Sequence, residues 1–436
     1  MRDLLITLIV VGAIPATLYR PYIGILVWSW ISYMNPHRLA YGFAYSMPFA
    51  QMIAVALVLA FLFNRDKQKI PLDRLTVTWG LFLLWMCLTT AMAIYPDSAM
   101  PALIKIIKIQ AVTVMSILFL TNYKRVEFLI WTIVLSIGFF SFKGGLFTLA
   151  TGGGFRVWGP PGSFIQENNS LALATLMVIP LIYYLYTVQK NKWIKYGLMA
   201  GFGLSLISAL GSQSRGAFIA SAAVLGFYWL KTKGKLISGL GIVMFAVVAW
   251  NFMPTEWHER MSSIQDYQED RSAMGRINAW IYSINIANHN ITGGGFNSWG
   301  EQTYAVYNPS AEFVAVAHSI YFSVLADHGW IGLLLFLLCF FFSWRNLTFV
   351  IRHADKGAPE ETLAKMLQVS YVAYFTGGAF LSLSYFDLPW HLIAISVLMK
   401  KFMLEGQLTY NPPKPRFPWM EQRPKPASTS GRGPSA

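Results

Sequence analysis

The chain has 436 residues, of which 55% are hydrophobic and only 12% are charged. So few charges cannot cover the surface of a soluble protein of this size, so the composition excludes an ordinary soluble enzyme and indicates a protein surrounded by lipid. The formal charge of +14 would suit a nucleic-acid ligand, but Lys and Arg lie mainly in short turns between apolar segments, where they report membrane orientation. We therefore expect an all-α polytopic membrane protein with no nucleic-acid partner.

Apolar stretches long enough to cross a bilayer recur along the whole chain. We expect about 12 transmembrane helices, at residues 4–19, 44–63, 76–95, 103–120, 128–150, 170–188, 194–212, 215–230, 236–253, 318–343, 367–386 and 388–404. Residues 22–34 are apolar but shorter than the roughly 20 residues of a crossing, so we expect them at the interface or only partway into the membrane. No small-residue cleavage pattern follows the first apolar segment, which is therefore expected to be retained as a helix.

Basic residues cluster in alternate turns, from residues 65–74 near the start to residues 400–401 near the end. The positive-inside rule assigns these turns to the cytoplasm, and with twelve crossings both termini are cytoplasmic too. The segments 151–169, 213–215 and 254–317 then share the opposite, outer side.

The chain divides into N-terminal transmembrane helices (1–253), one large outer loop (254–317), C-terminal transmembrane helices (318–409) and a tail (410–436). The tail is rich in Pro, Lys, Arg and Ser, which is typical of a disordered basic segment on the cytoplasmic side. In the loop, Met274, Ile277, Ile281 and Ile284 fall at helical spacing and predict an amphipathic helix on or near the membrane. GGGF at 293–296 is expected to end that helix with a flexible turn.

Arginines near the outer face are candidate ligands for an anion, because a charge at membrane depth needs a partner. Arg215, in GSQSRGAFIA between two spans, is either an anion clamp or a snorkelling side chain at a helix end. Arg276 begins the loop helix and either holds an anion together with backbone amides or is simply solvated, whereas Arg271 is expected to be exposed. Arg156 lies in a loop of Gly, Pro and aromatic residues that either binds sugar or is a plain structured turn.

His318 opens the apolar helix that follows the large loop. An imidazole with an ordinary pKa of about 6.5 can act as a base without much tuning, although a lone His at a helix start is more often a cap or a packed residue. His328 in the same helix is a weaker candidate, because its neighbour Asp327 can pair with it.

Two further polar pairs stand at the outer ends of spans. Lys105 and Lys108, one helical turn apart, either attract phosphate or snorkel. Asp387 and His391 lie near a helix break, and we expect a structural role for them. The sequence has no P-loop, no zinc-ligand spacing and no G-x-S-x-G, which argues against a site of the soluble phosphotransfer or hydrolase type.

GRINAWIYSINIANHNITGGGFNSW followed by HSIYFSVLADHGWIGLLLFL resembles the shared pattern of the O-antigen ligase and O-antigen polymerase superfamily. That pattern is an Arg-containing helix with a Trp, a Gly-rich turn ending in Phe, a His that opens a helix, and a late Gly-x-x-Gly. Its members here are Arg276, Trp280, Gly293 to Phe296, His318, Gly329 and Gly332. SRG at 214–216 also matches, and GPPGSFIQENNSLALATLMVIPL is similar to the exosortase-associated O-glycosylation ligases. Many members follow the His with Asn, whereas this chain has Ser319.

The resemblance implies a GT-C type glycosyltransferase of the bacterial inner membrane, with its large loop and active site in the periplasm and with no metal ion or cofactor. The implied donor is an undecaprenyl-diphosphate glycan, and the expected acceptor is lipid A-core oligosaccharide, which makes the chain an O-antigen ligase. An O-antigen polymerase and a protein O-oligosaccharide transferase are the alternatives, and a transporter is less favoured. We expect His318 to be the base, Arg215 and Arg276 to hold the diphosphate and Arg156 to be a third contact, with inversion at the anomeric carbon.

Overall fold

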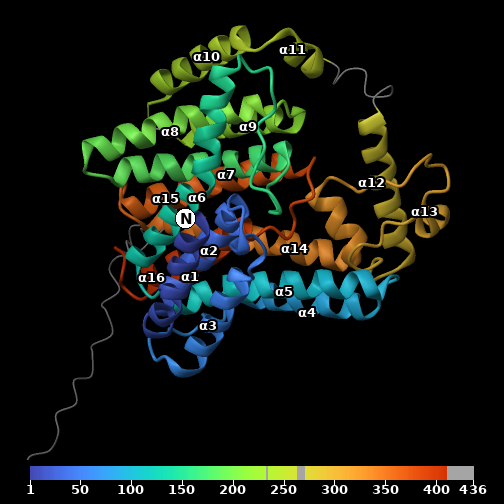
Figure 1. The fold of residues 1–436 in the computed structure, drawn as a ribbon, viewed down its shortest axis with the longest axis horizontal. Coiled ribbons are helices and arrows are strands. Elements are labelled where there is room, and N and C mark those ends of the chain that lie inside the picture. The colour runs from blue at the N-terminus through green and yellow to red at the C-terminus, as the bar shows by residue number, and fades with distance from the viewer. Residues whose placement is uncertain (232–233, 263–270, 410–436) are drawn as a thin grey trace, which may run out of the picture.

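The computed structural model describes residues 1–231, 234–262 and 271–409, and these ranges contain helices and no strand. The expected tail, 410–436, lies outside the described residues. The helices are α1 (Arg2–Tyr19), α2 (Pro21–Met34), η1 (Pro36–Leu39), η2 (Phe43–Ser46), α3 (Phe49–Phe63), α4 (Arg74–Ala91), α5 (Pro96–Phe119), α6 (Tyr123–Ala150), α7 (Asn168–Val188), α8 (Lys192–Gly211), α9 (Arg215–Lys231), α10 (Lys235–Phe252), α11 (Thr255–Ser262), α12 (Arg271–His289), α13 (Glu301–Tyr307), α14 (Ile320–His353), α15 (Pro359–Gly378) and α16 (Asp387–Leu404) (Figure 1).

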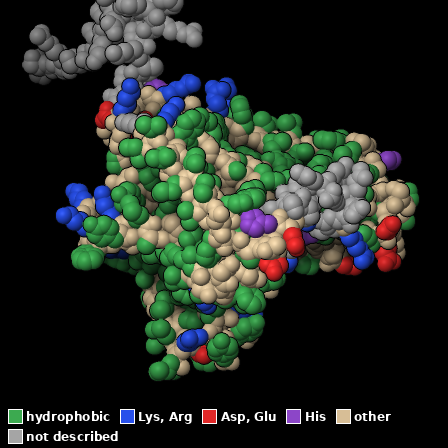
Figure 2. Space-filling view, turned by 90° about the horizontal axis from the view of Figure 1, so that it is seen from above, with side chains coloured by type: hydrophobic (Ala, Val, Ile, Leu, Met, Phe, Trp, Pro, Cys, Tyr) green, Lys and Arg blue, Asp and Glu red, His purple; other side chains and the backbone are tan. Residues whose placement is uncertain are grey.

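Eight helices of the described ranges are long and apolar enough to cross a membrane, namely α1, α4, α5, α6, α7, α8, α10 and α14, and α3 is a shorter apolar helix. Apolar side chains stay exposed on the outside of the bundle, as for Leu62 at 61% and Leu84 at 68%. Figure 2 shows such side chains spread over the face drawn, with Lys and Arg gathered at its edges. The chain is therefore a multi-pass membrane protein, as its composition predicts.

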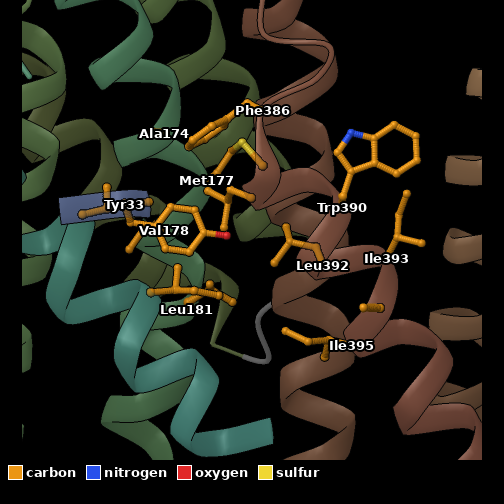
Figure 3. Close-up of a cluster of buried hydrophobic side chains, with 14 of the residues drawn as sticks. Tyr33, Ala174, Met177, Val178, Leu181, Phe386, Trp390, Leu392, Ile393 and Ile395 are labelled. Atoms are coloured by element: carbon orange, nitrogen blue, oxygen red, sulfur yellow. The ribbon is translucent and has the colours of Figure 1, made fainter. Parts of the chain in front are cut away.

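The centre of the bundle is formed by helices that other helices cover. Nearly every side chain of α16 is buried, and Trp390 stacks on Trp79 of α4 with ring centroids 5.6 Å apart. Figure 3 shows residues of α7 and α16 in this core, together with Tyr33 of α2. Because α15 and α16 are covered by protein, they tolerate polar residues that a lipid-facing helix would not, which explains why they are less apolar than the eight.

The turns that are rich in Lys and Arg meet at one end of the bundle, which we call the basic face. There, Arg125 at the start of α6 forms an ion pair with Asp66 at 2.8 Å, and Lys400 at the end of α16 pairs with Asp73 at 3.0 Å. This gathering agrees with the expected alternation of basic turns along the chain.

The opposite end, which we call the loop face, is formed by residues 35–47, 92–98, 151–167, 212–214, 253–262, 271–319 and 379–386. Gln213 Nε2 donates a hydrogen bond to the Gly153 carbonyl at 3.0 Å, and Asn168 Nδ2 donates to the Ser212 carbonyl at 2.7 Å. The described parts of the three segments expected on the outer side therefore share one face. In Figure 1, α12 and α13 lie at one extreme of the molecule, beyond the ends of α4, α5 and α14.

Residues 22–34, which we expected at the interface or only partway into the membrane, form most of α2, and this helix extends from the basic face to the loop face. At the basic face the Arg125 guanidinium lies 4.5 Å from the centre of the Tyr22 ring. At the loop face Asn35 Nδ2 donates to the Pro161 carbonyl at 2.8 Å. The 14 residues of α2 suffice because much of α2 is buried against other helices, so the length that a lipid-exposed span needs does not apply.

Asp387 and His391 are the residues that hold α2 in place, in line with the structural role expected for them. Ser32 Oγ donates to Asp387 Oδ2 at 2.6 Å, and Tyr33 Oη lies 2.6 Å from His391 Nδ1. All three of Tyr33, Asp387 and His391 are fully buried. Asp387 and His391 of α16 therefore each have a polar partner on α2.

The N-terminus lies at the loop face, which corrects the expectation that both termini are on the basic side. Asp3 Oδ1 accepts hydrogen bonds from the Gly42 and Ala44 amides, both at 3.1 Å. At the other end of α1, Asn64 Nδ2 donates to the Leu18 carbonyl at 2.9 Å. Helices α1 and α3 therefore run parallel, and the crossing by α2 reverses the direction that was expected for α1.

The predicted loop helix exists as α12, but it packs through a different side than the isoleucine pattern suggests. Ala279, Tyr282 and Ile286 are among the buried residues, whereas Ile281 and Ile284 are 41% and 36% exposed. Ile281 and Ile284 therefore face outward, which leaves them available to the membrane surface.

Candidate functional site

His318 lies at the loop face, two residues before α14 begins, with its backbone in the left-handed region at φ 43°. The residue before it is fixed, because Trp280 Nε1 of α12 donates a hydrogen bond to the Ala317 carbonyl at 2.9 Å. The Trp280 ring also stacks on Phe322 of α14 with centroids 4.9 Å apart. A side chain held in this costly backbone region by its surroundings is typical of functional sites.

Two charged side chains act on the His318 imidazole. Burial lowers the pKa of His318 below its usual range, the positive charge of Arg276 lowers it further, and the negative charge of Glu167 raises it in part. The lowered pKa keeps the ring neutral at pH 7, so that it can accept a proton. Arg276 comes from α12 and Glu167 from the residue before α7, so two distant segments converge on the histidine.

Arg215 is the first residue of α9 and is half-buried. The turn before it is held by Asn168, which binds the Ser212 carbonyl, and by Gln213, whose backbone is left-handed at φ 54°. Asn168 directly follows Glu167 in the chain. The start of α7 is therefore a common neighbour of the Arg215 turn and of His318.

The turn between α15 and α16 also touches both regions. A Cβ added to Gly216 would lie 3.2 Å from Phe380 Cβ, and one added to Gly378 would lie 2.7 Å from the Ile320 side chain. Ser384 Oγ donates to the Ile320 carbonyl at 3.1 Å. The Arg215 turn and the start of α14, which follows His318, therefore share these neighbours.

Arg156 and Arg271 do not join this group. Arg156 is exposed, and no hydrogen bond, ion pair or ring contact of its side chain is recorded within the described residues. Its neighbour Val157 is buried at 5% exposure and would contact a Cβ added to Gly144 of α6. Arg271 is exposed, as expected, with its guanidinium 4.8 Å from the centre of the Phe313 ring.

The glycine-rich turn is packed in place, which differs from the flexible turn that was expected. Helix α14 is broken at Gly329, where φ is 64° and ψ is −172°. The break frees carbonyls of the preceding turn, and the Gly294 and Gly295 amides donate to those of Ala326 and Asp327 at 2.8 and 3.0 Å. These hydrogen bonds satisfy buried backbone groups and fasten the loop to α14.

His328, the weaker candidate for the base, is buried in the core of the bundle. His328 is fully buried, its Nδ1 lies 2.7 Å from Thr89 Oγ1, and its ring packs edge-on against Phe296 at 4.6 Å. It does not hydrogen-bond to Asp327, whose Oδ2 instead accepts from Tyr385 Oη at 2.9 Å. These contacts indicate a structural role for His328.

Glu167 is the residue at this site that the sequence interpretation missed. It is the one carboxylate in the segment 151–169, and that isolation was the only signal available. Its effect on His318 depends on α7 beginning beside α14, which spacing along the chain does not show.

Within the described ranges, no three side chains of His, Cys, Asp and Glu gather in a way that could hold a metal ion.

A family model described as O-Antigen ligase matches residues 200–337, which contain Arg215, Arg276 and His318. This domain supports the resemblance to the O-antigen ligase and polymerase superfamily. Residues 1–190, which contain Arg156 and Glu167, match a family of unknown function (DUF5935). No curated protein matches the chain. The match at residues 200–337 supports an enzyme of the O-antigen ligase or polymerase kind, which acts on a lipid-linked glycan as substrate.

Proposed function

We propose that the chain is an O-antigen ligase that transfers a glycan from undecaprenyl diphosphate to lipid A-core oligosaccharide. The reaction takes place at the periplasmic face of the inner membrane, on a GT-C type scaffold, without a metal ion or cofactor. Two observations support the proposal. Arg215, Arg276 and His318 all lie at the loop face within the region that matches the O-antigen ligase family, and the charge of Arg276 acts on the pKa of His318.

The chemistry requires a base on one side of the anomeric carbon and cations on the other. His318 accepts the proton of the acceptor hydroxyl while that oxygen forms its bond to the anomeric carbon. The bond from this carbon to the diphosphate breaks in the same step, and undecaprenyl diphosphate leaves with the electron pair. Because no covalent intermediate forms, the configuration at the anomeric carbon inverts.

The leaving diphosphate concentrates negative charge, and fixed cations must meet that charge. Arg215 and Arg276 are assigned this role, because a guanidinium binds phosphate oxygens in a bidentate way. Arg156, which is exposed and has no recorded contact within the described residues, is assigned only a peripheral contact with the donor glycan.

Glu167 is assigned a positioning role through its charge. Its carboxylate favours the protonated imidazole that forms as His318 takes the proton, and it opposes the effect of Arg276. Arg276 and Glu167 thus shift the pKa of His318 in opposite directions.

The identity of the product tests this proposal. Purified protein in nanodiscs is given the undecaprenyl-diphosphate glycan with lipid A-core, with a protein acceptor, or with no acceptor, and the products are analysed by mass. A ligase yields lipid A-core that carries the glycan. Lengthened glycan on the lipid carrier would indicate the polymerase, glycosylated protein would indicate the protein transferase, and movement of the donor across the membrane without a new glycosidic bond would indicate a transporter.

A further inference from the structure

A cavity of about 650 Å³ opens between α2, α3, α5 and the loop at 162–164. Its wall carries four basic side chains, those of His37, Arg38, Lys105 and Lys108. Both lysines come from α5, whereas Arg38 and His37 come from η1, so the charges converge from two elements. No carboxylate lines the cavity, although Asp387 accepts a hydrogen bond from Ser32 behind its wall.

Two cations of this cavity, Lys105 and Arg38, lie over aromatic rings. Lys105 Nζ lies 4.1 Å from the centre of the Phe164 ring, and the Arg38 guanidinium lies 4.5 Å from the centre of the Tyr45 ring. No ion pair recorded among the described residues includes Arg38, Lys105 or Lys108. Like charges brought together in one cavity without acids repel one another, and an anion placed between them would relieve that repulsion.

His37 supplies a second observation that points to a ligand. Its Nδ1 is buried and has no hydrogen-bond partner in the described protein. Its ring packs edge-on against Phe49 with centroids 5.8 Å apart, so it is fixed at the cavity wall. A buried polar atom without a partner is costly, and an oxygen of a bound ligand would satisfy it.

The remaining wall of the cavity has polar residues (Ser32, Asn35, Gln51 and Ser163) and an apolar part. Ala50 and Ala54 of α3 and Ile104 and Ile109 of α5 line the apolar part, and Ile104 is 48% exposed. A ligand that fits both parts of this wall carries an anionic group at one end and hydrocarbon at the other.

A second cavity, of about 510 Å³, continues from the first toward the candidate site. Both are lined by Pro101, Lys105 and Phe164, and the second extends to Asn297, Trp299 and Val316. Val316 precedes His318 by two residues. A molecule whose anionic end lies in the first cavity can therefore extend along the second to Val316, two residues before the base.

We propose that the first cavity binds a phosphate group of the acceptor glycolipid, so that the acceptor glycan runs through the second cavity to His318. This inference rests on the proposed function, since it takes the acceptor to be a phosphorylated glycolipid. The site uses Arg38, Lys105 and Lys108 as phosphate ligands and lies apart from Arg215 and Arg276, which are assigned to the donor.

Kinetics on the full chain in nanodiscs test the site. The double variant Lys105→Gln/Lys108→Gln and the variant Arg38→Gln are compared with wild type at varied concentrations of lipid A-core, either phosphorylated or treated with phosphatase. We expect an acceptor KM raised about tenfold or more for the phosphorylated acceptor, with kcat and the donor KM unchanged. With the phosphatase-treated acceptor, wild type and variants should have equal KM. Lys69→Gln removes one charge at the basic face and serves as the control.

Equal effects of the variants on both acceptors, or a rise in the donor KM alone, would overturn the proposal. Native mass spectrometry of the bound lipid distinguishes a failure of this inference from a failure of the proposed function. It measures whether the protein retains phosphorylated lipid A-core in preference to phosphatase-treated lipid A-core, and this binding needs no turnover. Loss of this preference in the double variant is expected even if transfer to lipid A-core is not observed. If phosphatidylglycerol is retained in its place and the lipid A-core preference is absent, the cavity takes an ordinary membrane lipid and the inference is wrong.

Discussion

At the scale of single residues, burial and two charged side chains of opposite sign shift the pKa of the His318 imidazole. Arg276 lowers the pKa of His318 and Glu167 raises it. A base works only when unprotonated, so kcat/KM should fall as the pH drops through this pKa, which lies below the ordinary value of 6.5.

Glu167→Gln removes the influence that raises the pKa of His318, so the acidic limb of the profile of kcat/KM against pH should move to lower pH. Arg276→Gln should move it to higher pH, in addition to weakening donor binding. Glu312→Gln, a change of an exposed carboxylate in the same loop, should leave the limb in place. A limb that moves upward in Glu167→Gln, or stays where it is, would contradict this account of the base.

The arginines should differ in importance according to how the structure places them. Arg215→Ala should lower kcat/KM for the donor by about 100-fold, since it removes a charge-assisted contact with the diphosphate in a half-buried site. Arg156→Ala should lower it by no more than about fivefold, because that side chain is exposed. Steady-state kinetics with the donor varied measure both, and an Arg215→Ala protein with an unchanged donor KM and kcat would remove the assignment.

At the scale of elements, the break in α14 is what attaches the large loop to the membrane helices. Gly329 has a backbone conformation that only glycine adopts readily, and a Cβ there would lie 2.4 Å from the Ile291 carbonyl oxygen. The Gly-rich turn at 293–296 and Gly329, both part of the family pattern, therefore lie against each other through their backbones.

Gly329→Ala should lower the melting temperature and the transfer rate together, by displacing the turn that docks on α14. The strain and the contact should cost about 2 kcal/mol or more. Gly197→Ala is a matched control, because Gly197 lies within α8 with nothing within 4 Å of an added Cβ, and it should be neutral or slightly stabilising. Thermal unfolding in detergent, followed by intrinsic fluorescence, measures both, and equal melting temperatures for the two variants would be the adverse result.

The elements also show which parts of the fold could be predicted from the sequence. The long apolar helices and α12 follow from hydrophobic periodicity, which is a local property. The path of α2 between the two faces could not be predicted in this way. Its 14 residues suffice only because other helices pack around them, and the sequence of residues 22–34 does not show that packing. In the same way, Arg276 and His318 stand out through a motif, whereas Glu167 acts through a contact between distant segments.

At the scale of the whole molecule, the direction of α1 decides how the chain is threaded through the membrane. With the basic face in the cytoplasm, Arg20 should be cytoplasmic together with Lys67, while Tyr41 should be outside. In the alternative topology, in which α2 does not cross and the N-terminus is cytoplasmic, Arg20 would lie outside.

Single cysteines at these positions test the threading. In a Cys87→Ser background, Tyr41→Cys should react with a membrane-impermeant maleimide added to spheroplasts, whereas Arg20→Cys and Lys67→Cys should react only after the membrane is permeabilised. Labelling of Arg20→Cys in intact spheroplasts would restore a topology in which α2 does not cross.

The central claim is that His318 is the base of a metal-independent glycan transfer, and one comparison tests it most directly. Purified protein in nanodiscs is given undecaprenyl-diphosphate glycan and lipid A-core with excess chelator, and initial rates are measured for wild type, His318→Ala and His289→Ala, the last being an exposed histidine of the same loop. We predict transfer by wild type and His289→Ala and a loss of at least about 100-fold in His318→Ala. Transfer that persists in His318→Ala, or that requires a metal ion in the wild type, would contradict the account.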